Sequence, residues 1–275
     1  MRIVVTGTRG IPDILGGVET HCEELFPRIA RKDIDVTLIR RKSYVHDSLT
    51  EYKGIKLVDL VTPKKKSFEA IIHTFKAILK AKSLHADIVH IHAIGPALVT
   101  PLARLLGMKV VFTHHGPDYD RDKWGFAAKT MLRLGERMGC MFANEVIVIS
   151  EVINDLLVRK YGRRDCHLIY NGVPAPDKVA DTDYLNSLGV EPCKYVFAMG
   201  RFVPEKNFHQ LIRAFAALKQ QNYKLVLAGD TDFEDDYSKK LKSLAKENGV
   251  ILLLSLFRHL HQMRLFRCCL QYRML

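Results

Sequence analysis

The sequence predicts an α/β fold in which parallel sheets are built up in two successive domains, and three observations lead to that prediction. Short apolar runs alternate with segments of helical spacing along most of the 275 residues, which is typical of a doubly wound parallel sheet. A stretch rich in proline and polar residues interrupts the alternation, which then begins again. The hydrophobic content of 48% is enough to bury a core in one or two domains.

The first domain is predicted to span residues 1–171. Short apolar runs place its strands at 3–6, 36–39, 55–61, 87–91, 109–113 and 145–149. Helical spacing places one helix from Gly17 onwards and further helices at 68–84, 95–107, 122–142 and 151–161. In the first helix the apolar residues recur at three- and four-residue steps, so Glu19 is expected on the exposed face.

A linker is predicted at 172–192, and a second domain at 193–251. Pro174 and Pro176 begin the polar stretch that separates the two apolar regions. The second domain repeats the pattern with strands at 195–199 and 224–228 and helices at 207–220 and 235–248. It is expected to be the incomplete beginning of a second Rossmann-like sheet.

Composition limits the classes of function. The net charge of +12 and the pI near 9.4 favour polyanionic partners, whether nucleic acid, phosphorylated substrates or an anionic membrane surface. Because the charge is dispersed and no aromatic stacking motif accompanies it, no nucleic-acid partner is expected. The sequence shows neither a secretory leader nor an apolar run long enough to span a membrane. A cytoplasmic location is therefore expected, with a peripheral position on the inner face of the membrane as the alternative.

A glycine-rich loop follows the first predicted strand. It begins at Gly7 and places the pair Gly16 and Gly17 at the start of a helix. Backbone N–H groups at such a position can bind a phosphate, because glycine lets a ligand approach closely. The spacing differs from the G-x-G-x-x-G fingerprint, which makes a nicotinamide-dependent enzyme a weak alternative. A plain tight turn is the other interpretation of this loop.

Two adjacent histidines follow the strand predicted at 109–113. Neighbouring residues of an extended segment face opposite ways, so either His114 or His115 is expected at the ligand-binding edge of the sheet. A neutral imidazole there can hydrogen-bond a sugar hydroxyl or support developing charge. A satisfied structural histidine is the alternative. His90 and His92, at the end of another strand, are interpreted as mainly structural, with His92 a candidate for the wall of the site.

In the second domain, Arg201 and Lys206 lie between a predicted strand and a predicted helix. The planar fork of an arginine and the mobile charge of a lysine together suit a diphosphate. They can stabilise a departing nucleoside diphosphate without a magnesium ion. A solvated loop with two unrelated charges is the alternative. No metal site is expected, because the six cysteines lack CxxC spacing and no carboxylate cluster resembles a metal site.

Taken together, these motifs resemble the family-4 retaining glycosyltransferases of GT-B fold. The opening letters GTRGIP…GGVET are similar to the subgroup that assembles bacterial surface polysaccharides, including rhamnosyltransferase-like members. The resemblance implies that Gly16 and Gly17 meet the donor phosphates and that His115 contacts the transferred sugar. It implies that Arg201 and Lys206 bind the donor diphosphate. The V-x-S and Y-N-G-V segments add Ser150 and Asn171, with His114, as candidates for the cleft.

The activity implied by this resemblance is transfer of a sugar from a nucleotide-sugar donor, with retention of anomeric configuration, to a growing surface polysaccharide or lipid-linked glycan. Such catalysis consists mainly of positioning and electrostatics, with closure of the two domains and no metal cofactor. A sugar-nucleotide epimerase of similar architecture is a weaker alternative, since no convincing pair of catalytic carboxylates is visible.

The final residues, 252–275, depart from the pattern of the family. This stretch holds four arginines and no acidic residue, glycine or proline, and the E-x7-E motif expected of the family is absent. A frameshift or premature stop near residue 252 is therefore hypothesised. The alternative function is a catalytically inactive, truncated remnant that keeps only the acceptor-side domain.

Segment 63–84 joins a cluster of lysines to an apolar helical stripe. Lys64, Lys65 and Lys66 precede apolar residues such as Phe68 and Phe75. This combination can bind an anionic membrane, where a lipid-linked acceptor would lie. The alternative is the ordinary core-facing side of a helix packed on a sheet.

Overall fold

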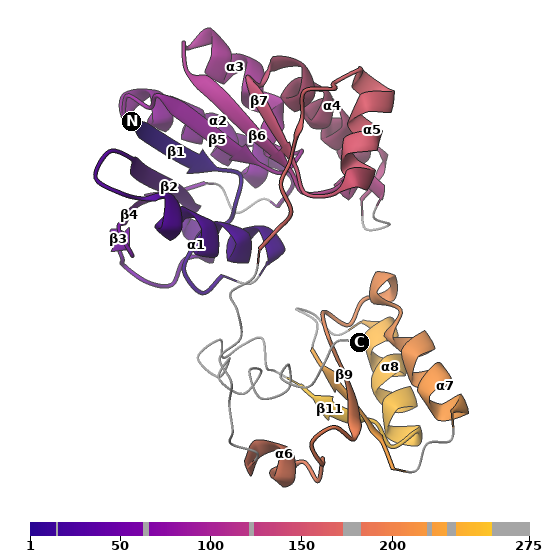
Figure 1. Cartoon of the computed structure of the whole chain (residues 1–275). Coiled ribbons are helices and arrows are strands. Elements are labelled where there is room, and N and C mark those ends of the chain that lie inside the picture. Colours follow the sequence, from indigo (N-terminus) through magenta and orange to yellow (C-terminus); the bar gives the residue numbers. More distant parts are fainter. Residues whose placement is uncertain are drawn as a thin grey trace. The chain divides into compact units, whose positions relative to one another are not determined.

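A computed structural model describes residues 1–14, 16–62, 66–120, 124–172, 183–218, 222–229 and 235–254 of the chain. The chain divides into two compact units, Met1–Val173 and Pro174–Leu275. Each unit contains a largely parallel sheet with helices connecting its strands (Figure 1). The predicted α/β fold with Rossmann-like parallel sheets is confirmed.

The first unit is built on a sheet with the strand order β3-β4-β2-β1-β5-β6-β7-β8. Its strands are β1 (Arg2–Thr6), β2 (Asp35–Arg41), β3 (Glu51–Tyr52), β4 (Ile55–Leu60), β5 (Ile88–His92), β6 (Lys109–His114), β7 (Glu145–Val148) and β8 (His167–Leu168). All neighbours pair in parallel except β3 and β4. The two-residue strands β3 and β8 were not predicted, because pairs that short carry no periodic signal.

Helices cover both faces of this sheet. They are α1 (Gly17–Ile29), α2 (Lys66–Ser83), α3 (Thr100–Leu105), α4 (Phe126–Phe142) and α5 (Glu151–Tyr161), with 3-10 turns η1 (Lys42–Tyr44), η2 (Pro96–Val99) and η3 (Asp118–Asp120). Successive strand residues point to opposite faces, so the neighbours Val4 and Val5 belong to different cores. Val4 packs in the core that includes residues of α2 to α5, and Val5 packs with Cys22 and Phe26 of α1.

The second unit has a parallel sheet of order β11-β10-β9. Its elements are α6 (Asp183–Ser187), β9 (Tyr195–Met199), η4 (Pro204–Lys206), α7 (Phe208–Ala217), β10 (Lys224–Ala228), α8 (Asp236–Glu247) and β11 (Ile251–Leu253). One face of the sheet packs on α7 and α8, where Ile212 and Leu241 are buried with Leu227. Helix α8 begins with a capping box in which the Asp235 carboxylate accepts from Ser238 N–H at 2.8 Å.

The structure corrects the end of the predicted linker. Helix α6 lies within the stretch 172–192, and its Leu185 is buried together with Val190 and Val226 on the sheet face opposite α7 and α8. Leu185 and Val190 therefore belong to the core of the second unit. The helix is only five residues long, which is too short for its apolar spacing to stand out in the sequence.

The structure also corrects the position at which the chain was expected to depart from the fold. Strand β11 pairs in parallel with β10, with Leu252 opposite Leu227, and Leu252 packs against the core below α7 and α8. Residues 252 and 253 thus continue the sheet. The remainder of the predicted anomalous tail, 255–275, lies outside the described residues.

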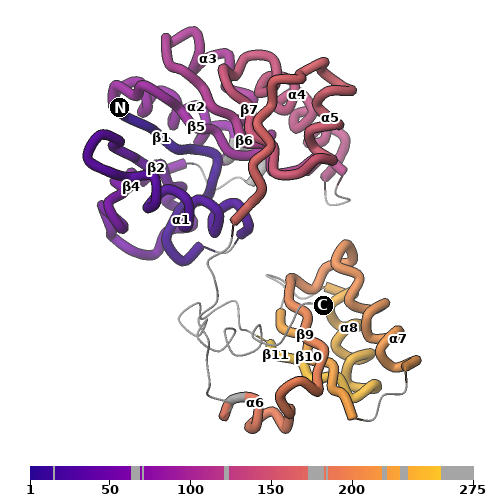
Figure 2. The backbone as a smooth tube through the Cα atoms, viewed as in Figure 1, coloured from indigo at the N-terminus to yellow at the C-terminus, as the bar shows by residue number. Residues whose placement is uncertain are grey.

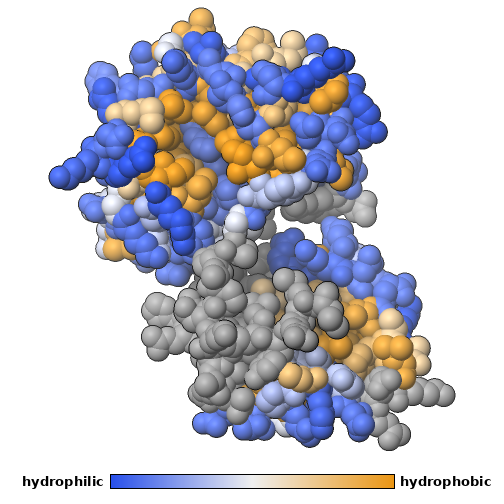
Figure 3. Space-filling model, in the orientation of Figure 1, coloured by the Kyte–Doolittle hydropathy of each residue, from blue (hydrophilic) through white to orange (hydrophobic). Residues whose placement is uncertain are grey.

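Apolar side chains also reach the surface, in patches separated by hydrophilic residues on the face that Figure 3 presents. Within the described part of the chain, none of the helices combines the length and the hydropathy needed to cross a bilayer.

Candidate functional site

The carboxyl ends of β1, β5 and β6 meet at one edge of the first sheet. Strand β1 pairs with β2 on one side and with β5 on the other, so the strand order reverses at β1 (Figure 2). Ligands of open α/β sheets bind outside the carboxyl ends of the strands at such a reversal. The candidate functional residues of the first unit gather at this edge.

Gly7 brings the loop after β1 against the end of β5. Its φ is +98°, and a Cβ atom added there would lie 2.1 Å from the carbonyl oxygen of His92. Only glycine allows both the left-handed backbone and the close approach. The loop therefore runs directly beside His92.

Glu19 is buried beneath this loop, which corrects the exposed position predicted for it. Its carboxylate accepts hydrogen bonds from Arg9 N–H at 3.0 Å and from Arg9 Nε at 3.1 Å, and from Thr8 Oγ1 at 3.3 Å. Burial alone would raise the pKa of Glu19, but the hydrogen bonds and charge of Arg9 outweigh burial and lower the pKa. The helical spacing of α1 was interpreted correctly, but the loop folds back over the first turn and covers it.

The two adjacent glycines at the start of α1 differ in their surroundings. Gly16 has φ +155°, and an added Cβ atom would lie 1.9 Å from Glu19 Oε2 and 2.5 Å from an Arg9 nitrogen. Gly17 is exposed, and a Cβ atom added there would meet nothing within 4 Å. Gly16 is therefore needed to accommodate the Arg9–Glu19 ion pair, whereas the space beside Gly17 is open.

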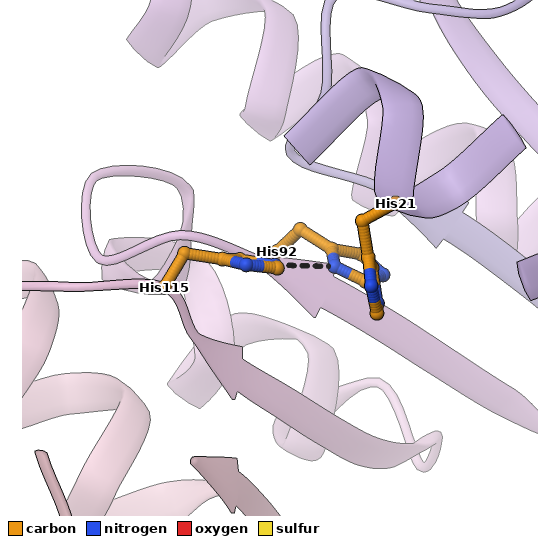
Figure 4. A group of neighbouring side chains, drawn as sticks. All are labelled: His21, His92 and His115. Atoms are coloured by element: carbon orange, nitrogen blue, oxygen red, sulfur yellow. Dashed lines mark hydrogen bonds between the residues drawn. The ribbon is translucent and has the colours of Figure 1, made fainter. Parts of the chain in front are cut away.

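Three imidazoles converge at the same edge of the sheet. His92 ends β5, His115 follows β6, and His21 comes from α1 (Figure 4). His92 Nδ1 and His115 Nε2 are 2.9 Å apart, within hydrogen-bonding distance. The centroid of the His21 ring lies 5.7 Å from that of His92 and 5.3 Å from that of His115. One ring nitrogen of each residue lies within 4.8 Å of those of the other two.

These rings are held in the neutral form at neutral pH. Burial lowers the pKa of His115 to about 4, with the nearby His21 and His114 adding to the shift. Burial also lowers the pKa of His21, and it lowers the pKa of His92 well below its usual range. A neutral imidazole has one nitrogen that donates and one that accepts, so this edge can offer lone pairs to a hydroxyl or a cation.

His114 ends β6 at this edge, but its ring lies inside the protein and not with the other imidazoles. The ring is fully buried, accepts from Gly116 N–H through Nδ1 at 3.1 Å, and lies with Nε2 2.9 Å from Glu136 Oε1. Since Nδ1 accepts, Nε2 carries the proton and donates it to the carboxylate. Both ring nitrogens are therefore occupied inside the protein.

Glu136 is the centre of a buried polar network on α4. Besides His114, its carboxylate accepts from Tyr119 at 3.0 Å, from Tyr161 at 2.7 Å and from Lys160 at 3.2 Å. Burial by itself would raise the pKa of Glu136, but the hydrogen bonds from His114 and Tyr161 and the charge of Lys160 lower it to about 2.

Gly139, about one helical turn after Glu136, lets α4 pack closely against the sheet, because a Cβ atom there would lie 2.8 Å from the Phe112 ring.

Ser150 lies two residues after β7, and Asn171 lies three residues after β8. The Ser150 hydroxyl accepts from Ile153 N–H at 3.3 Å and so caps the amino terminus of α5. Asn171 is exposed near the end of the first unit.

In the second unit, Arg201 and Lys206 lie on the loop between β9 and α7, as predicted. Both residues are exposed, while the Phe202 ring between them is buried and packs edge-on against Phe208 at 5.6 Å. The buried ring anchors the loop, so the two cations are displayed from a fixed backbone at the carboxyl end of β9.

Two members of these clusters were missed in the sequence. Nothing in the spacing of α1 distinguishes His21, and Glu136 lies in an apolar helix far from His114 in the chain. Only the pairing of β5 with β6 and the docking of α1 and α4 bring these residues to the strand ends. The H-x-H pattern of His90 and His92 was the one visible signal, because alternate strand residues share a face.

Two family models match parts of the chain. The sequence model of Glycosyltransferase Family 4 matches residues 15–175, more than half of the chain. The chain belongs to this family. A second model, Glycosyl transferases group 1, matches residues 185–263, so both units of this family 4 chain lie within glycosyltransferase models.

An individual relative of this family 4 chain shares less than a third of its residues over the matched region. YqgM of Bacillus subtilis, an uncharacterized glycosyltransferase, is 29% identical over 172 residues, which cover 61% of the chain and 46% of YqgM. The chain thus matches about half the length of this curated relative.

Solved structures show the same fold. HepE from Anabaena, in complex with UDP and glucose, is 21% identical with a TM-score of 0.69, and the match covers 92% of the chain and 68% of HepE. The catalytic domain of starch synthase IV from Arabidopsis thaliana is 14% identical with a TM-score of 0.68, over 92% of the chain and 74% of that domain. At these identities the likeness shows the fold alone.

Proposed function

We propose that the protein transfers a sugar from a nucleotide-sugar donor to a growing surface polysaccharide or lipid-linked glycan, with retention of configuration at the anomeric carbon. The observation that carries this proposal is the neutral His115 at the carboxyl end of β6, beside the glycine loop of a family 4 chain. HepE has been solved with UDP-glucose, which makes UDP-hexoses the first donors to test.

His115 is proposed to contact the transferred sugar. A neutral ring can accept a hydrogen bond from a hydroxyl of that sugar and hold its anomeric carbon in place. In the reaction the bond from the anomeric carbon to the diphosphate breaks, and the acceptor oxygen bonds to the same face of the sugar. The acceptor proton passes to an oxygen of the departing diphosphate.

The departing diphosphate is proposed to be held by positively charged side chains and by backbone N–H groups. Arg201 and Lys206 supply positive charge where negative charge develops, and no metal cofactor is required for that role. The open space beside Gly17 allows a phosphate to approach the amino terminus of the 13-residue helix α1. Gly16 is proposed to act with it by shaping the loop around the Arg9–Glu19 ion pair.

Binding of the nucleotide tests this assignment most directly. Calorimetry of the full chain with UDP, GDP and dTDP should show at least one nucleotide whose affinity falls about 10-fold or more in Lys206→Ala and in Arg201→Ala. Lys239→Ala is the matched control, since Lys239 is an exposed lysine on α8. If no nucleotide binds, or if the control loses as much affinity, the proposed diphosphate site is wrong. Nucleotide-free binding of a glycan acceptor would then favour the inactive remnant.

A peripheral contact with an anionic membrane is proposed for α2. One side of this helix is in the core through Ala77 and Ile78, yet Ile71, Phe75 and Leu79 recur every four residues with 38%, 48% and 46% of their surface exposed. A second apolar stripe on the solvent side suits the interface of a bilayer. Lys64 and Lys65, which precede the helix, lie outside the described residues.

Sedimentation with liposomes tests the membrane contact. The full chain should sediment with vesicles that contain anionic lipid, and changing Lys64, Lys65 and Lys66 to Glu should abolish this. The control changes Lys239, Lys240 and Lys246, exposed on α8, to Glu and alters the net charge equally. Equal loss in both variants would show a general charge effect and contradict a contact located at α2.

A further inference from the structure

The cluster of His21, His92 and His115 has the composition of a metal site. Each imidazole comes from a different element, and one ring nitrogen of each lies within 4.8 Å of those of the other two, among the described residues. Three imidazoles converging in this way are a typical donor set for a transition-metal ion. Hard cations such as Mg²⁺ prefer oxygen ligands, and the nearby carboxylate of Glu19 is already bonded to Arg9 and Thr8.

Among the described residues, the ring of His92 has no hydrogen-bond partner other than His115. Its Nδ1 shares a hydrogen bond with His115 Nε2 at 2.9 Å, while its Nε2 is buried and has no hydrogen-bond partner in the part of the chain that the structure describes. Two imidazole nitrogens at this distance need one proton between them. A metal ion can take the place of that proton and bind both rings.

The surroundings hold two of the three rings in place. The His92 ring stacks on His90 with centroids 4.3 Å apart and receives the edge of Phe26 at 5.6 Å. His90 is itself bonded to Thr113 Oγ1 at 2.7 Å. His115 stacks on His92 at 5.3 Å, and His21 is half-buried on α1. Packing therefore fixes the rings of His92 and His115 before any ion binds.

The spacing of His92 and His115 is close to that of two ligands of a four-coordinate zinc ion. Zn–N bonds of about 2.0–2.1 Å in a tetrahedron place ligand nitrogens about 3.3 Å apart. The nitrogens of His92 and His115, 2.9 Å apart, must separate by about 0.4 Å to reach that value.

We propose that His21, His92 and His115 bind a divalent transition-metal ion, Zn²⁺ in the first place, with a fourth coordination position open to water or an exogenous ligand. The proposal concerns the first unit alone and is independent of sugar transfer. Its consequence rests on the proposed function: because His115 is also the residue proposed to contact the transferred sugar, metal binding and that contact exclude one another. The site would then control transfer.

The test is a metal titration of the full chain, freed of any affinity tag. Calorimetry with Zn²⁺ should show one ion bound per chain, and His21→Ala should weaken the affinity at least about 100-fold, since loss of a ligand costs no less than loss of its supporting partner. His46→Ala, which removes an exposed histidine of the same unit, should bind as the wild type does. Co²⁺ should give the intense visible absorption of a four-coordinate ion in the wild type and in His46→Ala, but not in His21→Ala.

A second variant keeps the test decisive. His115→Ala removes a different ligand and should lose the Co²⁺ absorption as well, and far-UV circular dichroism checks that both ligand variants are folded. Absence of Zn²⁺ binding by the wild type, retained affinity in the ligand variants, or equal loss in His46→Ala would overturn the proposal. The titration uses neither donor nor acceptor, so its failure would leave the proposed transferase activity unaffected.

Discussion

Two adjacent pairs of identical residues, His114 and His115 after β6 and Gly16 and Gly17 after β1, show how one edge of the sheet divides its work. His114 is fully buried with both ring nitrogens bonded to protein groups, whereas His115 faces the other imidazoles at the open edge. Gly16 accommodates the Arg9–Glu19 ion pair, and Gly17 faces open space. In each pair one residue serves the fold and its neighbour is available to a ligand.

The two residues of each pair differ because one has all of its contacts inside the protein and the other does not. A buried polar group costs free energy unless it is hydrogen-bonded, so a residue whose capacity is completely used inside the protein is structural. A residue at the same edge with unused capacity can bind something else at little cost to the fold. This comparison predicts which substitutions damage stability and which damage binding.

The largest effect is expected where the structural network loses its centre. Glu136→Ala should lower the free energy of unfolding by about 3–5 kcal/mol, because it leaves His114, Tyr161 and Lys160 without their acceptor in a buried site. Urea unfolding followed by circular dichroism measures this. Glu145→Ala, which removes an exposed partner of His167, should cost less than about 1 kcal/mol. A similar cost for both would contradict a structural role for the network.

Acid should weaken the same network. The pKa of Glu136 is lowered from 4.5 to about 2, so the unfolded chain takes up a proton at a higher pH than the folded chain does. The stabilisation is complete above about pH 4.5 and is lost as pH falls towards 2, which amounts to a loss on the order of 3 kcal/mol. Unfolding free energies measured across this window should fall more steeply for the wild type than for Glu136→Gln. Parallel curves would show that Glu136 makes no such contribution.

Substitution of His115, the neighbour of His114, should damage activity and leave stability nearly unchanged. His115→Ala should reduce sugar transfer about 100-fold, as expected for loss of a positioned polar group, while changing the free energy of unfolding by less than about 1 kcal/mol. His114→Ala should cost more stability than His115→Ala, because it leaves the Glu136 carboxylate without its buried donor. Transfer rates and urea unfolding of the two variants test this assignment of His115 to activity and His114 to stability.

The smallest effect on stability is expected at Gly17, and its neighbour Gly16 should differ from it. Gly17→Ala should leave stability unchanged or raise it by about 0.5 kcal/mol, because the position is helical and unobstructed, and should weaken nucleotide binding. Gly16→Ala should lower stability by about 1–3 kcal/mol, because φ +155° is unfavourable for alanine and its Cβ meets Glu19. Thermal unfolding and nucleotide calorimetry of both variants test this. Equal destabilisation by the two substitutions would contradict the assignment of a structural role to Gly16 alone.

Most of the fold was predictable because its signals are local. Buried parallel strands appear as short apolar runs, and each predicted run, such as 109–113, corresponds to a strand. The elements that were missed are short. Helix α6 and strand β11 belong to the second unit through tertiary contacts, such as those of Leu185 and Leu252 with its cores, which no local pattern encodes.

The sequence by itself determined the α/β fold class, the approximate positions of the strands and the placement of polar residues at strand ends, because apolar periodicity and glycine loops act over a few residues. Tertiary structure alone decided which polar residue meets which. Glu19 is buried because a loop folds over it, His114 is structural because α4 carries Glu136 beneath it, and His21 joins His92 and His115 because α1 docks beside β5. Such contacts depend on the packing of elements far apart in the chain.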